Sequence, residues 1–371
     1  MNNNKTLKII ISGGGTGGHL FPAIAIGDIL KKYNHQIIYI GSKYGIEANN
    51  NFFNGNKSYL INIKGLARTI TIKNIFNNLI LPFRIIISIY NVSRIINKNK
   101  PDVIIGTGGY ASLIPLWVGI QKNIKTIIQE QNVIPGMVTK LLGEKVSLLF
   151  LSFEESKNHI KNKNHITVGN PIRSSINFMD KNIAQNILKL NNDKFTVFIV
   201  GGSQGASPLN NHFNRNVKFY IDNQIQLIWQ TGKNDYQKMK SKYKSQETIK
   251  IYNFIDNIEV QYNAADLIIS RAGATAISEM IFLNKPSILI PYPQAADNHQ
   301  VLNAKSLSNR NAAIMIEQNE LKNNLLEKKI KQLKENKNLL TKMEASINKI
   351  KPNNTESSIL NAINQIINKN D

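Results

Sequence analysis

The 371-residue sequence has no cysteine, no long hydrophobic run and a long interval without any acidic residue. Without cysteine the chain forms neither a disulfide nor a thiolate metal site, which is compatible with a reducing cytoplasm. The apolar run near the start is interrupted at Gly13, so we expect neither a signal peptide nor a membrane span there. The most apolar stretch elsewhere, residues 79–90, contains Pro82 and Arg84 and is too short to cross a bilayer.

The interval without acidic residues runs from Glu47 to Asp102. Its basic residues are Lys57, Lys64, Arg68, Lys73, Arg84, Arg94, Lys98 and Lys100, and its apolar residues include Ile75, Phe76, Leu79, Ile80, Leu81 and Phe83. An interfacial membrane segment needs this combination, because apolar side chains enter the headgroup layer while cations meet anionic lipid. We therefore predict that the basic apolar segment, residues 64–94, contacts a membrane surface.

The total charge of +22 and the isoelectric point near 9.8 favour polyanionic partners. Asn, Ile and Lys are abundant throughout, however, as a biased codon composition would produce, so the total charge alone identifies no partner. A nucleic-acid-binding module would interleave aromatic with basic residues and carry a docking motif. Here Arg and Lys alternate with Ile and Asn, so nucleic acid is not an expected partner.

Short β-branched runs alternate with longer helical patterns, which predicts parallel βαβ units. The expected strands lie at residues 8–12, 36–40, 59–63, 102–106, 126–129, 148–151 and 166–168, and again at 195–200, 226–230, 250–252, 266–270, 287–291 and 313–316. Glycine-rich turns follow three of them, in IIISGGGTGGH, VIIGTGGYAS and VFIVGGSQGA. This recurrence predicts an α/β protein with two Rossmann-like domains facing a cleft.

Turn residues at 169–171 mark the expected boundary between these domains. We predict an N-terminal domain at 1–168 and a C-terminal domain at 169–349. The last stretch, about 350–371, contains an amphipathic helix that can pack back on the first domain.

A glycine-rich turn between a strand and a helix exposes backbone N–H groups at the positive end of the helix dipole, which suits a phosphate or diphosphate. Gly13, Gly15 and Gly18 satisfy the G-x-G-x-x-G pattern of dinucleotide enzymes. The acid that such enzymes carry after the second strand is missing, because Gly41 and Ser42 stand there. No loop ends in GK[ST] either. Nicotinamide and ATP chemistry are therefore disfavoured.

His19 follows the first glycine turn at the expected start of a helix. The carboxyl end of the first strand is where open α/β sheets bind ligands. The positive end of a helix favours the neutral imidazole, which is the form that a general base needs. His19 is the candidate base, with a capping or packing role as the alternative.

The segment SRAGATAISE, residues 270–279, indicates a strand end, a tight turn and a helix start. Its backbone can surround a nucleotide, and the carboxylate of Glu279 can accept two ribose hydroxyls. The alternative is an ordinary connection with a solvated glutamate. DNHQ at 297–300 suggests polar recognition rather than metal ligation, and no metal or cofactor is expected.

Together these motifs resemble the MurG family of N-acetylglucosaminyltransferases. The matching segments are GGTGGH at 14–19 with FPA after it, PDVIIGTGGYAS at 101–112, EQN at 130–132, GNPIR at 169–173, GGSQGA at 201–206, FID at 254–256, SRAGATAISE and DNHQ. They come in the family's order and spread over residues 13–300. The resemblance implies a glycosyltransferase type B fold, with the UDP-GlcNAc donor held mainly by the second domain.

The resemblance also implies roles for individual residues. Ser203 and its neighbouring backbone would meet the diphosphate, Arg173 would add charge, the backbone of Ile255 would read uracil, and Glu279 would hold the ribose. Asn132 and Gln300 would contact GlcNAc, Thr16, Gly17 and Gly18 would close from the opposite domain, and Ala274, Thr275, Ala276, Ile277 and Ser278 would wrap the nucleotide.

The implied reaction transfers GlcNAc, with inversion, to the C4 hydroxyl of MurNAc-pentapeptide on an undecaprenyl-diphosphate lipid at the cytoplasmic face of the bacterial membrane. His19 is the expected base and Glu130 the second candidate. Backbone amides and helix dipoles would stabilise the leaving diphosphate without a metal. Ile75, Leu79 and Trp117 would lie on the membrane and lipid-acceptor face. One departure is Gln129, which replaces the first residue of the family's HEQN and removes a titrating group.

Two other enzymes of this architecture remain as alternatives. Diacylglycerol glycosyltransferases share the GGTGGH-like loop and act at membranes. UDP-GlcNAc 2-epimerases share the fold but need no lipid, so the basic apolar segment argues against them.

Overall fold

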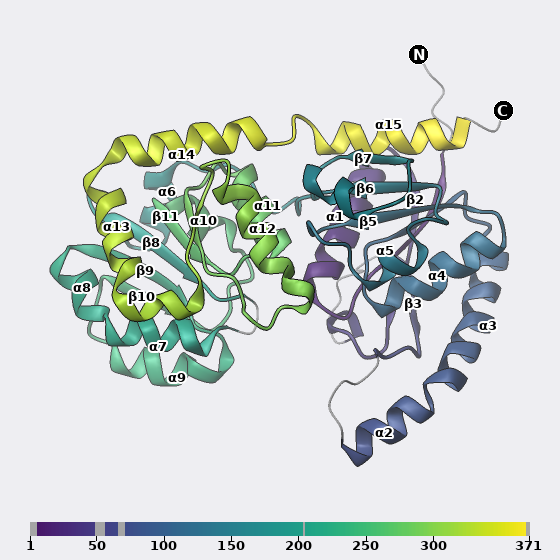
Figure 1. Ribbon diagram of the computed structural model, residues 1–371, viewed down its shortest axis with the longest axis horizontal. Helices are drawn as coiled ribbons and strands as arrows, with labels where there is room; N and C mark the ends of the chain where they lie inside the picture. The colour runs from purple at the N-terminus through teal and green to yellow at the C-terminus, as the bar shows by residue number, and fades with distance from the viewer. Residues whose placement is uncertain (1–5, 49–55, 66–70, 203–204, 369–371) are drawn as a thin grey trace. The chain divides into compact units, whose positions relative to one another are not determined.

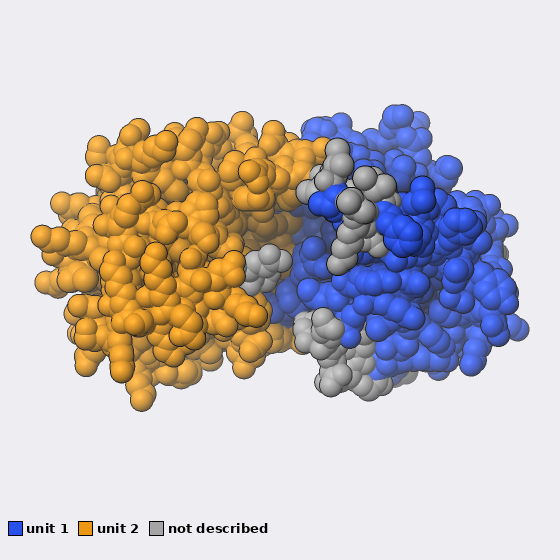
Figure 2. All heavy atoms as spheres, turned by 90° about the horizontal axis from the view of Figure 1, so that it is seen from below, with its two compact units in different colours: residues 1–173, 352–371 blue, residues 174–351 orange. Residues whose placement is uncertain are grey.

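The computed structural model describes residues 6–48, 56–65, 71–202 and 205–368 (Figure 1). The chain forms two compact units, coloured separately in Figure 2. The first unit contains residues 1–173 and 352–371, and the second contains residues 174–351. The chain therefore passes between the units twice, after Arg173 and after Lys351.

The first unit is built on a seven-stranded parallel sheet with the order β3-β2-β1-β4-β5-β6-β7. Its strands are β1 (Lys8–Ser12), β2 (Gln36–Ser42), β3 (Lys57–Ile61), β4 (Val103–Gly106), β5 (Lys125–Glu130), β6 (Leu148–Leu151) and β7 (His165–Thr167). Strand β1 pairs in parallel with both β2 and β4, so the first strand of the sequence lies at the centre of the sheet. The central strands β1, β4 and β6 are apolar runs because helices cover both of their faces.

Helices cover the two faces of this sheet and bury the residues of its central strands. The helices of the unit are α1 (Gly17–Lys32), α2 (Ile72–Leu79), which contacts α3 rather than the sheet, α3 (Leu81–Asn99), α4 (Tyr110–Gln121), α5 (Met137–Leu142) and α15 (Thr355–Asn368), with short 3-10 turns η1 (Ile46–Ala48) and η2 (Glu154–His159). Ile9 and Ile11 pack with α1 and with Ile359 and Ile363 of α15. Ile10 packs on the other face with residues of α3, α4 and α5. The C-terminal helix is thus part of the core of the first unit.

The second unit is built on a six-stranded parallel sheet with the order β10-β9-β8-β11-β12-β13. Its strands are β8 (Phe195–Val200), β9 (Ile225–Gln230), β10 (Ile249–Tyr252), β11 (Leu267–Ser270), β12 (Ser287–Leu289) and β13 (Ile314–Met315). The helices are α6 (Lys181–Ile187), α7 (Ser207–Arg215), α8 (Val217–Asp222), α9 (Lys233–Lys242), α10 (Glu259–Ala264), α11 (Ala274–Phe282), α12 (His299–Ser308), α13 (Leu325–Glu335) and α14 (Lys337–Ile350), with 3-10 turns η3 (Ala296–Asn298) and η4 (Gln318–Asn323).

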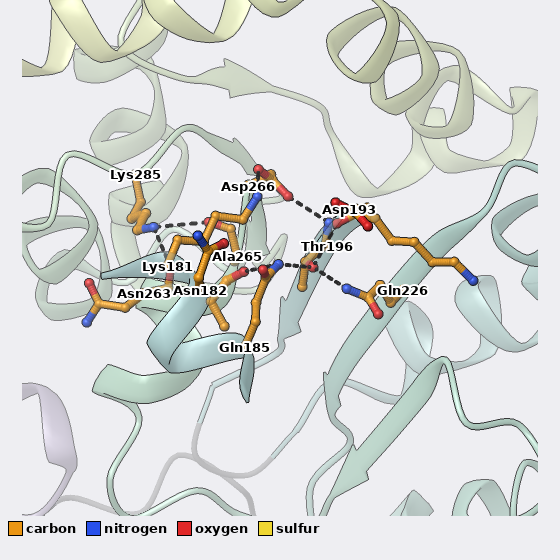
Figure 3. Close-up of polar contacts among 12 residues, drawn as sticks. Lys181, Asn182, Gln185, Asp193, Thr196, Gln226, Asn263, Ala265, Asp266 and Lys285 are labelled. Carbon is orange, nitrogen blue, oxygen red and sulfur yellow. Dashed lines mark hydrogen bonds and ion pairs between the residues drawn. The ribbon is translucent and has the colours of Figure 1, made fainter. Parts of the chain in front are cut away.

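A polar network fixes the amino end of this second sheet (Figure 3). Asp266, just before β11, accepts the backbone N–H of Thr196 at 2.8 Å and the ammonium of Lys181 at 2.5 Å. Lys285, before β12, donates to the carbonyls of Asn263 and Ala265 at 2.9 and 3.0 Å. These contacts connect α6, α10 and three strand starts at the edge opposite to the glycine turns.

The α/β fold class predicted from the sequence is confirmed, and each predicted strand overlaps an observed one. In both sheets the strand order reverses beside the first strand, between β1 and β4 and between β8 and β11. Open α/β sheets bind ligands at the carboxyl ends of strands where the order reverses. The site residues are therefore sought in the turns after these four strands. In the described part of the chain, no helix is both long and apolar enough to cross a membrane.

Candidate active site

The glycine turns after β1 and β4 interlock at the reversal point of the first sheet. A Cβ on Gly13 would lie 1.8 Å from Oγ1 of Thr107, and one on Gly109 would lie 2.4 Å from the carbonyl oxygen of Gly14. Gly109 also has a φ of +71°, which side chains rarely adopt. Glycine is therefore required at Gly13 by the side chain of Thr107 and at Gly109 by the backbone of Gly14.

His19, in the first turn of α1, is held by Thr107. Nδ1 of the imidazole lies 3.1 Å from the carbonyl oxygen of Thr107, and Oγ1 of Thr107 donates to the carbonyl of His19 at 2.7 Å. A carbonyl oxygen only accepts, so Nδ1 carries the hydrogen in this contact and the lone pair of the neutral ring is on Nε2. A Cβ on Gly108 would lie 2.7 Å from Nδ1, so a side chain there would displace the ring.

Glu47, which no sequence motif marks, contacts the first glycine turn. Its buried carboxylate accepts the backbone N–H of Gly15 at 2.9 and 3.1 Å and that of Ser42 at 2.9 Å. A glycine-rich turn of this kind suits a phosphate, but here a carboxylate of the chain itself accepts the backbone N–H of Gly15. An isolated Glu in a 3-10 turn carries no sequence signal for this role.

Glu130, at the end of β5, is buried and accepts three hydrogen bonds. Its Oε2 accepts from the backbone N–H of Gly136 at 2.8 Å and from Oγ1 of Thr139 at 2.5 Å, and its Oε1 accepts from the backbone N–H of Asn132 at 3.1 Å. The carboxylate therefore fixes the loop after β5 and the start of α5. Asn132 lies in that loop, partly exposed.

Gln129 precedes Glu130 and is fully buried. Its side-chain amide donates to Oγ of Ser152 at 2.9 Å and to the carbonyl of Gly169 at 3.3 Å. Gly169 has a φ of +80°, and a Cβ on it would lie 2.5 Å from Pro352. Gln129 thus anchors the segment that leads out of the first unit.

Arg173, the last residue of the first unit before the chain passes to the second, lies beside α1. Its guanidinium carbon is 4.6 Å from the ring centroid of Phe21, a cation–π distance. Thr16 and Gly18, at the tip of the glycine turn, are exposed, and Gly17 between them is partly exposed. The structure therefore gathers Thr16, Gly17, Gly18, His19 and Arg173 at the beginning of α1.

In the second unit the corresponding turns follow β8 and β11. Ser203 lies outside the described residues. On either side of it, Gly202 has a φ of +95° and Gly205 a φ of +78°, and the N–H of Gly205 donates to the carbonyl of Gly202 at 3.0 Å. Helix α7 then begins with no acidic residue in its first turn.

The backbone of Ile255 has a partner within the chain. Its N–H donates to Oε1 of Gln230 at 3.1 Å, while Nε2 of Gln230 donates to the carbonyl of Gly202 at 3.0 Å. The Gln230 side chain thus bridges the turn after β8 and the segment after β10. No sequence pattern marks Gln230, because a glutamine at a strand end resembles any other.

Helix α11 begins directly after the turn at 271–273, with no acidic residue in its first turn. Ala274, Ile277 and Glu279 are buried, whereas Thr275, Ala276 and Ser278 are partly exposed. The alternative of a solvated Glu279 is wrong, since the carboxylate is buried and accepts from the hydroxyl of Tyr262 at 3.1 Å.

Arg271, also missed from the sequence, supports the neighbouring loops. Its guanidinium donates to the carbonyls of Ile290 and Pro291 at 3.2 and 3.0 Å and to Oε1 of Gln318 at 2.6 Å. Burial lowers the pKa of Arg271 to about 10, so it remains charged at neutral pH. Gln300, at the start of α12, accepts the backbone N–H of Tyr292 at 2.9 Å.

Within the described residues, no group of three or more His, Cys, Asp and Glu side chains is arranged to hold a metal ion.

The chain matches two family models, the glycosyltransferase family 28 N-terminal domain over residues 9–150 and the C-terminal domain over residues 196–358. Two similar curated proteins are both UDP-N-acetylglucosamine–N-acetylmuramyl-(pentapeptide) pyrophosphoryl-undecaprenol N-acetylglucosamine transferases. The protein of Christiangramia forsetii is 36% identical over 98% of both chains. The protein of Thermoanaerobacter sp. is 37% identical over 97% of this chain and all of its own.

Solved structures show the same fold. The crystal structure of MurG from Acinetobacter baumannii superposes with a TM-score of 0.76 at 24% identity, covering 97% of this chain and 99% of that one. The structure of S. aureus MnaA with UDP gives 0.71 at 14% identity, covering 98% and 97%. The chain therefore belongs to glycosyltransferase family 28 and, within it, to the MurG family.

Proposed function

We propose that this protein transfers GlcNAc from UDP-GlcNAc to the C4 hydroxyl of MurNAc-pentapeptide on an undecaprenyl-diphosphate lipid, with inversion at the anomeric carbon. The relatives that carry this activity in their names match nearly the whole chain. The observation that carries the chemistry is the contact between Nδ1 of His19 and the Thr107 carbonyl. The product would serve peptidoglycan synthesis, and through it cell shape and division.

In this proposal His19 is the general base. The lone pair on Nε2 takes the proton of the acceptor hydroxyl as that oxygen attacks C1 of GlcNAc and UDP departs. Glu130 is less suited to this task, because three donors already hold its carboxylate. We assign it the task of positioning Asn132, which would contact GlcNAc.

The second unit would bind the donor. Helices α7 and α11 begin after turns at the reversal point and have no acid in their first turns, so their positive ends suit a diphosphate. The first unit is less suited, since Glu47 occupies the Gly15 amide. Ser203 and the neighbouring amides would stabilise charge on the leaving diphosphate, with Arg173 adding positive charge and no metal required.

Nucleotide recognition would fall to the surroundings of α11. Thr275, Ala276 and Ser278 are the partly exposed residues that can line the nucleotide, with the backbone of Ala274 and Ile277 completing the first turn. Glu279 would accept the ribose hydroxyls and Gln300 would contact the sugar. The N–H of Ile255 would meet uracil after Gln230 turns away from it.

The protein would lie on the cytoplasmic face of the membrane through the basic apolar segment. Phe76, Leu79 and Phe83 are 63%, 72% and 68% exposed among the described residues, and together they form an apolar surface. Ile86, Ile87 and Tyr90 extend it along α3. Trp117 on α4 is 40% exposed, while the Ile75 side chain lies outside the described residues.

A panel of acceptors tests the proposal. The purified protein is incubated with UDP-GlcNAc and either lipid-diphosphate-MurNAc-pentapeptide or diacylglycerol, and the products are identified by mass spectrometry. We expect a disaccharide-pentapeptide lipid with the first acceptor and no product with the second. Glycosylated diacylglycerol, or conversion of UDP-GlcNAc to its C2 epimer detected by proton NMR, would replace this function with one of the two alternatives.

A further inference from the structure

We propose that Thr107 and Gln131 are positioning residues that set the tautomer and the proton affinity of His19. This inference rests on the proposed role of His19 as the base. Thr107 and Gln131 are both buried; Thr107 contacts His19 directly, and Gln131 contacts Thr107.

Thr107 contacts His19 at two points. Its carbonyl oxygen faces Nδ1 of the ring at 3.1 Å, and its Oγ1 donates to the backbone carbonyl of His19 at 2.7 Å. Thr107 is itself fixed, because its N–H donates to the carbonyl of Ser12 at 2.8 Å. One residue at the end of β4 therefore holds both the ring and the main chain of the base.

Gln131 places a second donor on the same carbonyl. Its Nε2 lies 2.9 Å from the Thr107 oxygen and 2.8 Å from the carbonyl oxygen of Gln129. A primary amide has two N–H groups, so both are used in these contacts. The carbonyl oxygen of Thr107 thus accepts from Gln131 and from His19 together.

This arrangement differs from the familiar pairing of a catalytic histidine with a carboxylate. A neutral carbonyl fixes the Nδ1–H tautomer but stabilises the imidazolium less than a carboxylate does. Sharing that carbonyl with Gln131 weakens its attraction for Nδ1–H further. Because of both features, the ring stays neutral, and able to act as a base, at a lower pH than a histidine paired with a carboxylate would.

The ring gains a proton on Nε2 during the reaction. The acceptor O–H bond breaks, the O–C1 bond forms, and the C1–O bond to the diphosphate breaks with its electron pair leaving on UDP. The Nδ1–H bond to Thr107 is kept throughout and strengthens while the ring is positive. Thr107 therefore acts through His19 and does not touch the substrate.

Two sets of variants test these tasks. Gln131→Met removes the second donor at similar volume, so the Thr107 carbonyl serves His19 alone and the acid limb of the kcat/KM profile is expected to move to higher pH. Thr107→Val removes the hydroxyl that holds the His19 carbonyl, whereas Thr107→Ser keeps it. We expect kcat to fall by up to about 100-fold in Thr107→Val with KM little changed, and to recover in Thr107→Ser, because small misplacements of a base cost this much.

Ionisable side chains on the surrounding elements include Glu47, Glu130 and Arg173, together with Tyr110 at the start of α4 and Asp28, Lys31 and Lys32 farther along α1. Glu47 is bonded to Gly15, Glu130 to Gly136 and Thr139, and Arg173 lies over Phe21. All of these side chains are kept in every variant, so a shift of the acid limb between wild type and Gln131→Met is not due to their removal.

The direct readout is the ¹⁵N NMR spectrum of the full-length protein labelled at histidine, with His19 assigned by its loss in His19→Ala. We expect the Nδ1–H tautomer in wild type and Thr107→Ser, a mixture of tautomers in Thr107→Val, and titration at higher pH in Gln131→Met. The Nε2–H tautomer in wild type, or identical titration of wild type and Gln131→Met, would overturn the inference. If His19→Ala kept full activity, the proposed role of His19 as the base would be wrong. The NMR spectra would still test separately whether Thr107 and Gln131 set the tautomer and titration of His19.

Discussion

The carboxylate of Glu47 accepts the backbone N–H of Gly15 through both of its oxygens, at 3.1 and 2.9 Å. The glycine turn that precedes His19 is thereby shaped by a buried negative charge from η1. A charge in that place keeps anions from the turn and fixes the start of α1.

The first prediction concerns this contact. Glu47→Ala leaves the N–H groups of Gly15 and Ser42 without their acceptor, and each buried hydrogen bond to a charged group contributes about 1.5–3 kcal/mol. We expect a clear loss in the free energy of unfolding and a fall in kcat, with a smaller loss in Glu47→Gln. Urea unfolding and initial rates measure both. Glu144→Gln, a change at an exposed glutamate paired with Lys161, is the control and should match wild type.

The second prediction concerns Glu279 and the ribose. If the carboxylate accepts a ribose hydroxyl, wild type should bind UDP about 10- to 100-fold more tightly than its 2′-deoxy analogue, since such a bond contributes about 1.5–3 kcal/mol. Glu279→Gln should lose most of that preference, because once the carboxylate is gone, removal of the 2′-hydroxyl has little further effect on binding. Calorimetric titration of both nucleotides measures this. If Glu279→Gln still discriminated fully between the two nucleotides, another residue would bind the ribose. Tyr262→Phe removes the hydroxyl that donates to Glu279, so its preference for UDP should lie between those of wild type and Glu279→Gln.

The third prediction concerns Lys285 in the second unit. Burial lowers the pKa of Lys285 from 10.5 to about 8, with Asp266 partly offsetting this. Above pH 8 the folded state has released a proton that the unfolded chain keeps up to about 10.5, so the free energy of unfolding rises with pH in this window. Between pH 8 and pH 10, we expect the free energy of unfolding of wild type to rise by up to about 3 kcal/mol relative to that of Lys285→Met. Urea unfolding at intervals of one pH unit measures the difference, and the exposed Lys122→Met serves as the control. A difference that stays constant with pH would show that Lys285 keeps its ordinary pKa.

The fourth prediction concerns the membrane surface. Replacing Phe83 and Tyr90, both exposed on α3, by Ser should weaken binding to vesicles of anionic lipid and leave the pH profile of a soluble-acceptor assay unchanged. The matched control replaces Ile183 and Ile187, which are similarly exposed on α6 of the second unit. Vesicle sedimentation at low and high salt separates the apolar from the electrostatic contribution. Equal loss in both double variants would mean that α3 is not the contact surface.

The strand pattern was predictable because parallel strands covered on both faces must be apolar runs, and such runs stand out in the sequence at β1, β4 and β8. The position of His19 was predictable for a related reason, since a glycine turn after a central strand places the next residues at the reversal point. The motif resemblance then indicated the family, which the relatives confirm.

The partners of these residues were not predictable. Glu47, Gln131 and Gln230 reach their contacts through the packing of separate loops, at sequence distances that no local pattern encodes. Burial of Glu279 depended likewise on Tyr262, from another helix. Local sequence therefore predicts where a turn lies, whereas tertiary packing decides which of its polar groups are already occupied.

The most direct test is acceptor-dependent release of UDP from UDP-GlcNAc in the presence of EDTA, with wild type and His19→Ala compared. A base contributes about 10²- to 10⁴-fold, so the variant should lose activity in that range while still binding UDP. Release by wild type should need the lipid-diphosphate-MurNAc acceptor and should survive EDTA. Unchanged turnover in His19→Ala, or activity abolished by EDTA, would contradict the account.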